Sequence, residues 1–448
     1  MLIAPAAGGH PISVFEVAKS LNWTWAAVLA AIPVLFLVPI GHDQTWHLWV
    51  GRQLLHGASL YRDVIEVNPP LWFWLGVPLA AIGEIFGLQS RAVVIAFFAG
   101  SIALSLFLSP SRYRPALLVA FVLIPLLDFG QREHFTLIAT APYVLLIAAR
   151  AQGNEVRHPI AIGLFGSFGF ALKPFFVIVP MVLEAVIWRE RRVRPETISL
   201  ALCAIAYAIA VPLFAPEYLS DVVPMVRDAY RYIQGPSILP LVLVTFGIAL
   251  VGFLSSRHRG DPVSRTLGVA ALAFLVAMIA QGKGWTYHSV PARGFLFLAL
   301  AVELMRLRER PFSYALMATA AGLCFFPVGV YQNPFRAEME AHIADLPRRT
   351  SITVLSDNPS VAWPMVDERG LSWASRQFSL WQGVAAGKGV RAAQNAMRQA
   401  ISRDLEKKPQ IIMLVGDSTD LVPRHALADY DLRRRTERFT SYSRRSSP

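Results

Sequence analysis

Asp43 is the residue of this sequence best placed to act as a catalytic base. It stands just beyond the first long apolar run, 22–41, at the start of a polar loop that covers residues 42–68. A carboxyl group so close to the hydrocarbon edge should bind protons more tightly than an exposed one, and could take a proton from a hydroxyl substrate. The alternative is that Asp43 only caps a helix at a membrane boundary.

The same loop offers further polar side chains. Glu66 precedes Asn-Pro-Pro, so we expect it near the start of the next helix, as a second carboxylate or a hydrogen-bonding partner for sugar hydroxyls. His42, Asp43 and His47 could form a metal cluster, but their spacing is not a recognised ligand pattern. No cofactor is therefore expected, and a divalent metal is the less favoured alternative.

Basic and histidine side chains stand at the ends of several later apolar runs. They are Arg132 and His134 in FGQREH, Lys173 in ALKPFF, and Lys283 and His288 in GKGWTYH. Ionisable groups at membrane depth are costly and usually face a site or cavity. Because Arg and Lys bind phosphate oxygens, these residues predict a substrate that carries a phosphate at the bilayer surface. The alternative is that long side chains only anchor the spans.

Composition identifies a bilayer as the solvent of most of the chain. Of the 448 residues, 54% are hydrophobic and 16% charged, and the mean hydropathy is +0.45. Both cysteines, Cys203 and Cys324, lie in apolar runs, which excludes a disulfide framework. The apolar windows are roughly 22–41, 69–88, 91–109, 115–129, 135–150, 159–172, 174–188, 198–215, 237–254, 266–281, 290–305 and 312–330.

The distribution of basic residues predicts the orientation, because Lys and Arg are retained on the cytoplasmic side. One set of alternate loops is rich in arginine: Arg112, Arg114, Arg150, Arg157, Arg189, Arg191, Arg192, Arg194, Arg257, Arg259, Arg265, Arg306, Arg308 and Arg310. The intervening loops hold few: Arg132, Lys173, Arg227, Arg231 and Lys283. The N-terminus (1–21) and the first set are thus predicted to be cytoplasmic, and loop 42–68 and the C-terminal region periplasmic. This asymmetry also accounts for the net charge of +12, so nucleic acid is not an expected partner.

The segment 69–88 decides whether the number of membrane spans is odd or even. If it crossed the bilayer fully, every later loop would change sides. We therefore predict that it lies at the interface or dips and returns, because Pro69 and Pro70 begin a helix well and Trp72 and Trp74 suit the headgroup region. Eleven true spans result.

Residues 331–448 have no further membrane window and predict a small α/β domain. RAEMEAHIAD (336–345) and 388–407 are expected helices, and ITVLS (352–356) and IIMLV (411–415) are expected strands. Asp357 and Asp417 follow the strands without a Gly-rich phosphate loop, so they are expected to be turn residues. The Arg/Ser-rich tail after Tyr430 is expected to fray at its end.

This pattern resembles the GT-C superfamily of integral-membrane glycosyltransferases, in particular bacterial relatives of the protein mannosyltransferases and of the lipid A aminoarabinose transferase. The matching features are Asp43, the stretch GRQLLHGASLYRDVIEVNPPLWFW (51–74), the corners FGQREH and ALKPFF, and the C-terminal domain. The resemblance implies an α-helical polytopic membrane fold of about 11–12 membrane helices, formed by residues 22–330, with a small C-terminal α/β domain, 331–448.

The resemblance also implies a reaction. Asp43 would be the base, and the substrate-binding residues would be Tyr61, Glu66, Arg132, His134, Lys173, Lys283 and His288. The enzyme would move a sugar from a polyprenyl-phosphate carrier to a hydroxyl of a glycan, lipid or protein, with inversion, at the periplasmic face of a bacterial inner membrane. The Asp-Gln pair at 43–44, where many relatives have Asp-Glu, argues further against a metal. Alternatives are a lipid or sugar transporter or flippase, and a glycan ligase that uses a diphosphate carrier.

Overall fold

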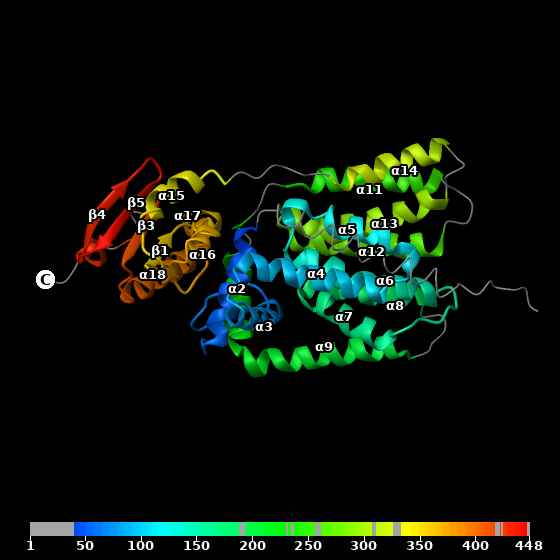
Figure 1. The fold of residues 1–448 in the computed structure, drawn as a ribbon, viewed down its shortest axis with the longest axis horizontal. Coiled ribbons are helices and arrows are strands. Elements are labelled where there is room, and N and C mark those ends of the chain that lie inside the picture. Colours follow the sequence, from blue (N-terminus) through cyan, green and yellow to red (C-terminus); the bar gives the residue numbers. More distant parts are fainter. Residues whose placement is uncertain are drawn as a thin grey trace, which may run out of the picture.

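A computed structural model describes residues 40–187, 193–229, 232–233, 237–255, 261–306, 311–325, 333–416, 422 and 424–445. Its first part is a helical bundle and its second a small domain with a sheet (Figure 1). The helices of the bundle region are α2 (His42–Leu55), α3 (Leu71–Ile85), α4 (Ser90–Leu108), α5 (Arg114–Val122), α6 (Arg132–Arg150), α7 (Pro159–Ala171), α8 (Ile178–Ile187), α9 (Pro195–Phe214), α10 (Val223–Ala229), α11 (Leu239–Ser255), α12 (Pro262–Gln281), α13 (Val290–Arg306) and α14 (Pro311–Leu323).

Each predicted apolar window that lies in the described part contains a helix. Within that part, four helices are long and apolar enough to cross a bilayer: Ser90–Leu108, Pro195–Phe214, Pro262–Gln281 and Thr286–Arg306. Shorter apolar helices are Leu71–Ile85, Pro159–Ala171, Pro174–Ile187 and Tyr314–Leu323. The window 22–41 lies outside the described residues except for its last two positions. The chain is thus a polytopic membrane protein, as its composition predicts.

The window 115–129 differs from a single span. Helix α5 has only 9 residues and ends at Val122, and a 3₁₀ turn, η2 (Leu126–Asp128), follows it. Pro125 directly precedes that turn, and a proline cannot donate the hydrogen bond that would continue the helix. The break leaves residues 126–131 as an irregular segment that leads into α6.

Helix α6 is the central helix of the bundle. All of its residues from Arg132 to Ala148 are buried, and it contacts α4, α5, α7, α8, α12 and α13. A helix that is buried on every side belongs in the interior of a bundle. By contrast, α9 lies along one edge of the bundle and exposes large apolar side chains, such as Leu202 and Phe214 (Figure 1). Such an exposed apolar surface suits contact with lipid.

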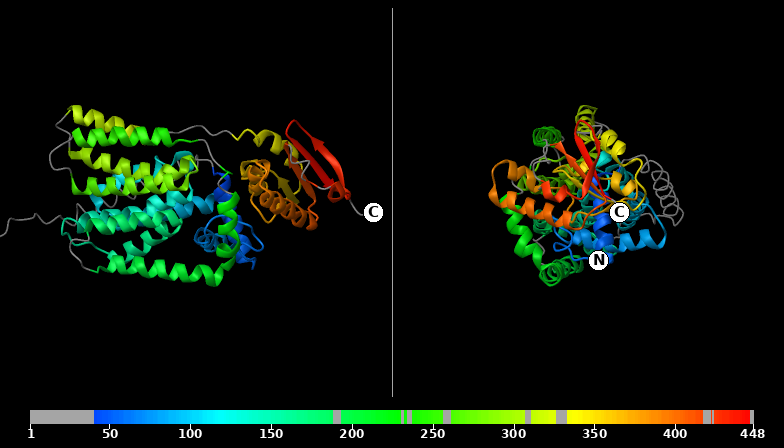
Figure 2. Two further views of the ribbon diagram at one scale, coloured as in Figure 1. Left: turned by 180° about the vertical axis from the view of Figure 1, so that it is seen from behind. Right: turned by 90° about the vertical axis from the view of Figure 1, so that its left-hand side faces the viewer.

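Helices α2 and α3 lie together at the end of the bundle that faces the C-terminal domain (Figures 1 and 2). A Cβ atom on Gly51 would overlap the carbonyl group of Gly76, so glycine at this crossing lets the two helices pack closely. His47 ties them further, because its Nε2 lies 2.7 Å from the Trp72 carbonyl oxygen. Helix α3 has 15 residues and is about 22 Å long, less than the roughly 30 Å of a hydrocarbon core.

The C-terminal domain contains α15 (Arg336–Ile343), α16 (Met365–Glu368), α17 (Gln382–Gly387), α18 (Arg391–Glu406) and five strands. The strands are β1 (Ser351–Leu355), β2 (Ser372–Trp373), β3 (Ile411–Val415), β4 (Tyr430–Arg435) and β5 (Phe439–Arg444), in the order β2-β1-β3-β5-β4. Strands β2, β1 and β3 are parallel, and β5 and β4 are added antiparallel. The expected strands at 352–356 and 411–415 are thus the centre of a mixed sheet.

The tail after Tyr430 begins with a hairpin that was not predicted from the sequence. Residues 430–444 form strands β4 and β5, and β5 pairs with β3 along Ile411–Val415. The end of the tail, residues 446–448, where fraying is expected, lies outside the described residues. The arginines are held at the protein surface, where Arg433 pairs with Asp345 and Arg438 with Glu338. Asp357 lies in a turn after β1, whereas Asp417 lies outside the described residues.

The C-terminal domain packs directly on loop 42–68 and helix α2. The side chains of Trp46 and Phe378 stack with ring centroids 4.9 Å apart, and Trp363 packs edge-on against Trp46 at 5.5 Å. Arg52 Nη2 lies 2.6 Å from Asp367 Oδ1, which adds an ion pair to the same interface. The buried aromatic rings therefore fix the domain over the first residues of α2.

Candidate active site

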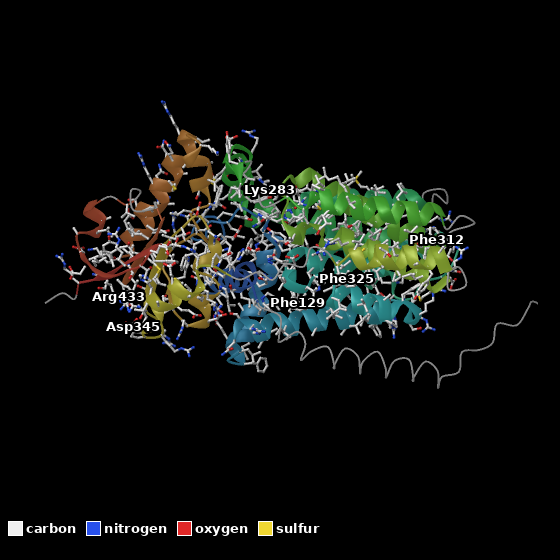
Figure 3. All side chains as sticks on the ribbon, turned by 90° about the horizontal axis from the view of Figure 1, so that it is seen from above. Phe129, Lys283, Phe312, Phe325, Asp345 and Arg433 are labelled. Atoms are coloured by element: carbon white, nitrogen blue, oxygen red, sulfur yellow. The ribbon has the colours of Figure 1, made fainter. Side chains whose placement is uncertain are left out.

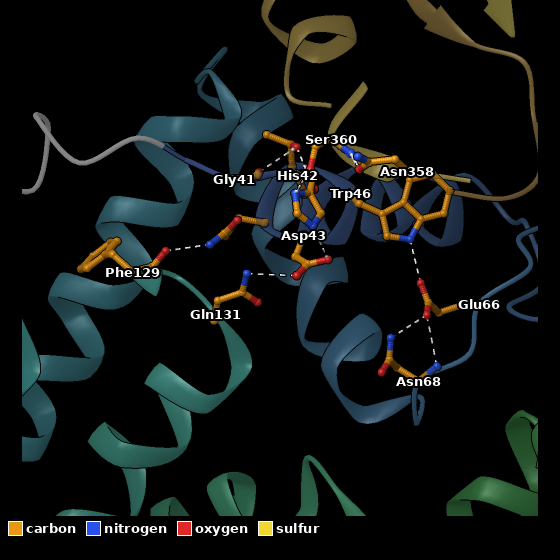
Figure 4. A network of polar contacts seen from close by, with 12 residues as sticks. Gly41, His42, Asp43, Trp46, Glu66, Asn68, Phe129, Gln131, Asn358 and Ser360 are labelled. Carbon is orange, nitrogen blue, oxygen red and sulfur yellow. Dashed lines mark hydrogen bonds and ion pairs between the residues drawn. The ribbon is translucent and has the colours of Figure 1, made fainter. Parts of the chain in front are cut away.

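Asp43 lies in the first turn of α2, at the end of the bundle. An acidic residue is favourable there because the N-terminus of a helix carries partial positive charge. Its Oδ2 accepts a 3.0 Å hydrogen bond from Gln131 Nε2, and its Oδ1 lies 3.6 Å from His42 Nε2 (Figure 4). The side chain is 28% exposed, so a substrate can reach the carboxylate while its neighbours restrict its orientation.

A cluster of buried charges lies at the start of α6. Lys173 forms an ion pair with Glu133, and its Nζ also donates a 2.6 Å hydrogen bond to Gln281 Oε1. His288 Nε2 lies 3.6 Å from Glu133 Oε1. The carboxylate of Glu133 thus joins two predicted site residues, Lys173 from the α7–α8 corner and His288 from the 3₁₀ helix η7 (Thr286–Ser289).

Arg132 connects this cluster to Asp43. Arg132 is only 8% exposed, and its Nη1 has no hydrogen-bond partner among the residues that the structure describes. The Asp43 carboxylate interacts electrostatically with both Arg132 and Lys173. Arg132 and Lys173 carry one positive charge more than Glu133 balances, so a buried donor and an excess of positive charge lie beside the partly exposed acid.

The environment of Lys173 brings the pKa of its ammonium group close to physiological pH. Burial lowers the pKa of Lys173 to about 8, the Glu133 carboxylate opposes the shift, and the Arg132 guanidinium adds to it. Lys173 is therefore mostly protonated at neutral pH and loses its charge in mildly alkaline solution. A basic group of this kind can bind an anion at neutral pH.

Glu66 accepts hydrogen bonds from helix α2 and from neighbouring residues of its own loop. Its Oε2 accepts from Trp46 Nε1 at 2.8 Å, and its Oε1 accepts from the Val67 and Asn68 backbone amides and from Asn68 Nδ2 (Figure 4). Burial raises the pKa of Glu66, and these hydrogen bonds oppose the shift. The carboxylate is buried and fully engaged, so it holds the loop on α2. Tyr61 has a similar place, because its hydroxyl donates to the Asn68 carbonyl oxygen at 2.6 Å.

Lys283 lies at the same end of the bundle as Phe129, whereas Phe312 lies at the opposite end (Figure 3). Its Nζ donates a 3.0 Å hydrogen bond to the Ile233 carbonyl oxygen, and it acts electrostatically on His288. Burial lowers the pKa of Lys283. Lys283 is thus at the edge of the charge cluster.

His134 is separated from the charge cluster by its packing. Its Nδ1 accepts a 3.1 Å hydrogen bond from the Gly130 amide, and its Nε2 lies 2.7 Å from the Phe121 carbonyl oxygen. The ring stacks on Phe98, and the side chain is completely buried. Both ring nitrogens therefore bond backbone groups, so His134 fixes the α5–α6 corner.

Metal ligands are not grouped in the described part of the chain, where no three His, Cys, Asp or Glu side chains come together. Of the His42, Asp43 and His47 set, His47 is buried against Trp72, and burial lowers its pKa to about 3. His47 therefore holds α2 to α3 as a neutral ring, with its Nε2 engaged by the Trp72 carbonyl oxygen.

Two contributors to the site were not identified from the sequence. Glu133 pairs with Lys173 and His288, and Gln131 holds Asp43. Glu133 had a signal of its own, because an acidic residue at the start of a buried membrane helix is costly unless it is paired. Gln131 had none, since glutamine is common in polar corners.

Comparisons with known proteins identify the fold. Neither a protein-family model nor a curated protein matches the sequence. Among solved structures, ArnT from Cupriavidus metallidurans, bound to undecaprenyl phosphate, aligns with a TM-score of 0.57 at 14% identity, over 94% of this chain and 97% of ArnT. The mycobacterial arabinofuranosyltransferase AftD aligns with a TM-score of 0.47 at 12% identity, over 95% of this chain and 40% of AftD. This chain is therefore a polytopic membrane protein with a fold like that of ArnT, which confirms the predicted helical membrane fold with a small C-terminal α/β domain.

Proposed function

We propose that this protein is an inverting glycosyltransferase that takes a sugar from a polyprenyl-phosphate carrier and transfers it to an acceptor hydroxyl. The observation that carries the proposal is the position of Asp43. In a chain with the fold of ArnT, a partly exposed carboxylate lies within electrostatic range of Arg132 and Lys173. A base beside buried cations suits a reaction in which a hydroxyl loses a proton and a phosphate departs.

The buried cations support a phosphate-bearing donor. Nη1 of Arg132 has no partner within the described part of the chain, and an unpaired buried donor is costly unless a ligand satisfies it. A phosphate oxygen is a suitable acceptor because its bond to a guanidinium is charge-assisted. The ArnT structure holds undecaprenyl phosphate, and a carrier of this class is the donor that we propose here. Lys173, Lys283 and His288 would surround the same headgroup.

The proposed reaction is a single displacement. The acceptor oxygen forms a bond to the anomeric carbon while its proton passes to Asp43. The bond between the anomeric carbon and the carrier's phosphate oxygen breaks, and its electron pair stays with the phosphate. Arg132 and Lys173 stabilise the negative charge on the departing lipid phosphate. Attack opposite the leaving group inverts the anomeric configuration.

The proposed location is the periplasmic face of a bacterial inner membrane. Helices α6 and α13 support this orientation, because each begins near the candidate site and ends with a basic residue, Arg150 and Arg306. Basic residues at those ends agree with the positive-inside rule. Acceptors would then be hydroxyl groups of envelope glycans, lipids or proteins.

Release of free carrier tests the proposal. Purified protein in lipid nanodiscs is given a panel of undecaprenyl-phosphate hexoses and pentoses together with envelope extracts as acceptors, and undecaprenyl phosphate is measured by mass spectrometry. A transferase releases the carrier from at least one donor without any ion gradient. A flippase leaves every donor intact but moves it across liposomes, which would contradict the proposal. A diphosphate-dependent ligase would consume only undecaprenyl-diphosphate glycans.

A further inference from the structure

His42 lies between Asp43 and the C-terminal domain (Figure 4). Its Nε2 is 3.6 Å from Asp43 Oδ1, and its Nδ1 is 3.1 Å from the hydroxyl oxygen of Ser360. The ring also packs against Phe378, with centroids 5.6 Å apart. Both Ser360 and Phe378 belong to the C-terminal domain, so a residue adjacent to the proposed base is held by a part of the chain more than 300 positions away.

The Ser360 hydroxyl is available for His42 because other groups hold the surrounding turn. The Ser360 amide donates a 3.0 Å hydrogen bond to Asn358 Oδ1, and the Ser360 carbonyl accepts a 2.6 Å hydrogen bond from Asn333 Nδ2. The backbone of the turn therefore does not need the hydroxyl. Ser360 is buried, so its hydroxyl is not simply a solvated surface group.

The contacts with Ser360 and Asp43 together favour one tautomer of His42. A neutral imidazole carries a proton on one ring nitrogen and accepts at the other. When the Ser360 hydroxyl donates to Nδ1, the ring proton is on Nε2 and points toward the carboxylate of Asp43. The opposite tautomer would direct a lone pair at an ionised carboxylate, which is unfavourable. The 3.6 Å separation exceeds a hydrogen bond in the free protein, and such contacts commonly shorten when substrate binds.

We propose that His42 is a positioning residue for Asp43, and that the C-terminal domain sets its tautomer and orientation through Ser360. This inference rests on the proposed function, in which Asp43 is the base. The Asp43 carboxylate is then held on one side by Gln131 and on the other by His42, and both contacts orient it toward the acceptor. The C-terminal domain thus takes part in the reaction without touching the reacting atoms.

A double-mutant cycle tests the inference. His42→Gln places an amide N–H near the position of Nε2 without needing Ser360, whereas His42→Asn cannot reach Asp43. We expect kcat to fall about tenfold or more in His42→Asn and about three- to tenfold in Ser360→Ala, with the KM for the lipid donor unchanged. His42→Gln should retain most activity, and adding Ser360→Ala to it should change nothing further.

Ser351→Ala is the matched control. It removes another serine hydroxyl of the same domain, at the start of β1, which accepts a 2.8 Å hydrogen bond from the Gln410 amide. Wild-type kcat is expected. If Ser360→Ala lowers kcat equally in the wild-type and His42→Gln backgrounds, or if His42→Asn is fully active, the inference is wrong. If Asp43→Asn is inactive and His42→Asn is fully active, only the inference about His42 is wrong. If Asp43→Asn is fully active, the proposed function is wrong.

Nitrogen NMR of ¹⁵N-histidine-labelled protein supplies a readout that needs no substrate. The His42 signal is assigned as the one missing in His42→Gln. The wild-type protein should show the Nε2-protonated tautomer, and Ser360→Ala should shift the population toward a mixture. An Nδ1-protonated ring in the wild type, or a tautomer unchanged by Ser360→Ala, would overturn the role of Ser360.

Discussion

Gln131 Nε2 donates a 3.0 Å hydrogen bond to Oδ2 of Asp43, and so joins two residues that are 88 positions apart. A second bond runs beside it, from Gln44 Nε2 to the Phe129 carbonyl oxygen at 2.7 Å. The first turn of α2 is thereby tied to the segment that leads into α6. The break after Pro125 matters for this reason, because a continuous helix would not leave residues 129–131 free to reach α2.

Replacement of Gln131 should impair the orientation of the base. In Gln131→Leu the carboxylate of Asp43 loses the donor to Oδ2, and we expect kcat to fall about tenfold while the donor KM stays near the wild-type value. Steady-state kinetics with the donor found in the nanodisc panel measure both. Gln152→Leu, which removes a hydrogen bond to the Ala148 carbonyl at the other end of α6, is the control. A rise in KM at constant kcat would contradict an orienting role.

Arg132 should dominate the affinity for the carrier phosphate. Arg132→Gln removes the charge and the unpaired donor, so we expect undecaprenyl phosphate to bind about 10- to 100-fold more weakly. Binding is measured by native mass spectrometry or by competition in nanodiscs. Arg62→Gln removes an exposed arginine that pairs with Glu217, and it should bind like the wild type. Equal affinity of Arg132→Gln and wild type would exclude Arg132 as a phosphate ligand.

Lys173 should make carrier binding depend on pH. Its pKa lies at about 8 instead of 10.5, so its charge, and with it part of the affinity for the phosphate, should be lost as the pH rises through about 8. Lys173→Met should bind weakly and without this transition. Binding by the wild type that stays constant from pH 7 to 9 would contradict the assignment.

The same pKa predicts a change in stability. Between about pH 8 and 10.5, the unfolded chain holds the Lys173 proton and the folded chain has lost it. The contribution of Lys173 to the free energy of unfolding therefore rises with pH in this window. Comparison of thermal unfolding between the wild type and Lys173→Met isolates this contribution.

His134 should affect stability and not binding. In His134→Asn the amide oxygen can still accept from the Gly130 amide, but the contact with the Phe121 carbonyl oxygen is lost. A buried carbonyl left without its partner costs about 1–3 kcal/mol, so the unfolding temperature should fall while the affinity for undecaprenyl phosphate stays unchanged. If a stably folded variant lost affinity for undecaprenyl phosphate, His134 would be a substrate-binding residue after all.

Much of the fold was predictable because a bilayer imposes simple rules on sequence. A membrane helix needs a long apolar run, so each window from 91–109 to 312–330 contains a helix, although the helix in window 115–129 ends early, at Val122. The parallel strands at Ile352 and Ile411 were visible for a related reason, since buried strands are continuous apolar runs. Strands β4 and β5 were missed because the arginines and the exposed Leu432 give no alternating pattern.

The sequence was enough to predict which charged residues belong to the candidate site, but not which residues they contact. Asp43, Arg132 and Lys173 stand out as ionisable groups at span ends, and the fold gathers them. Whether a polar residue faces a site or fills a structural role depends on contacts that are distant in sequence. Glu66 is engaged by Trp46, and His134 by Phe121 and Gly130, so both are structural in the free protein. Spacing alone could not distinguish them from Arg132.

Asp43→Asn tests the central claim most directly, because it keeps the size of the side chain and removes only its basicity. Release of undecaprenyl phosphate from the sugar-loaded carrier is measured alongside binding of undecaprenyl phosphate to the same purified variant. The account predicts that release falls at least about 1,000-fold, while the affinity for the carrier stays within about threefold of wild type. Release at the wild-type rate by this variant would contradict the assignment of Asp43 as the base.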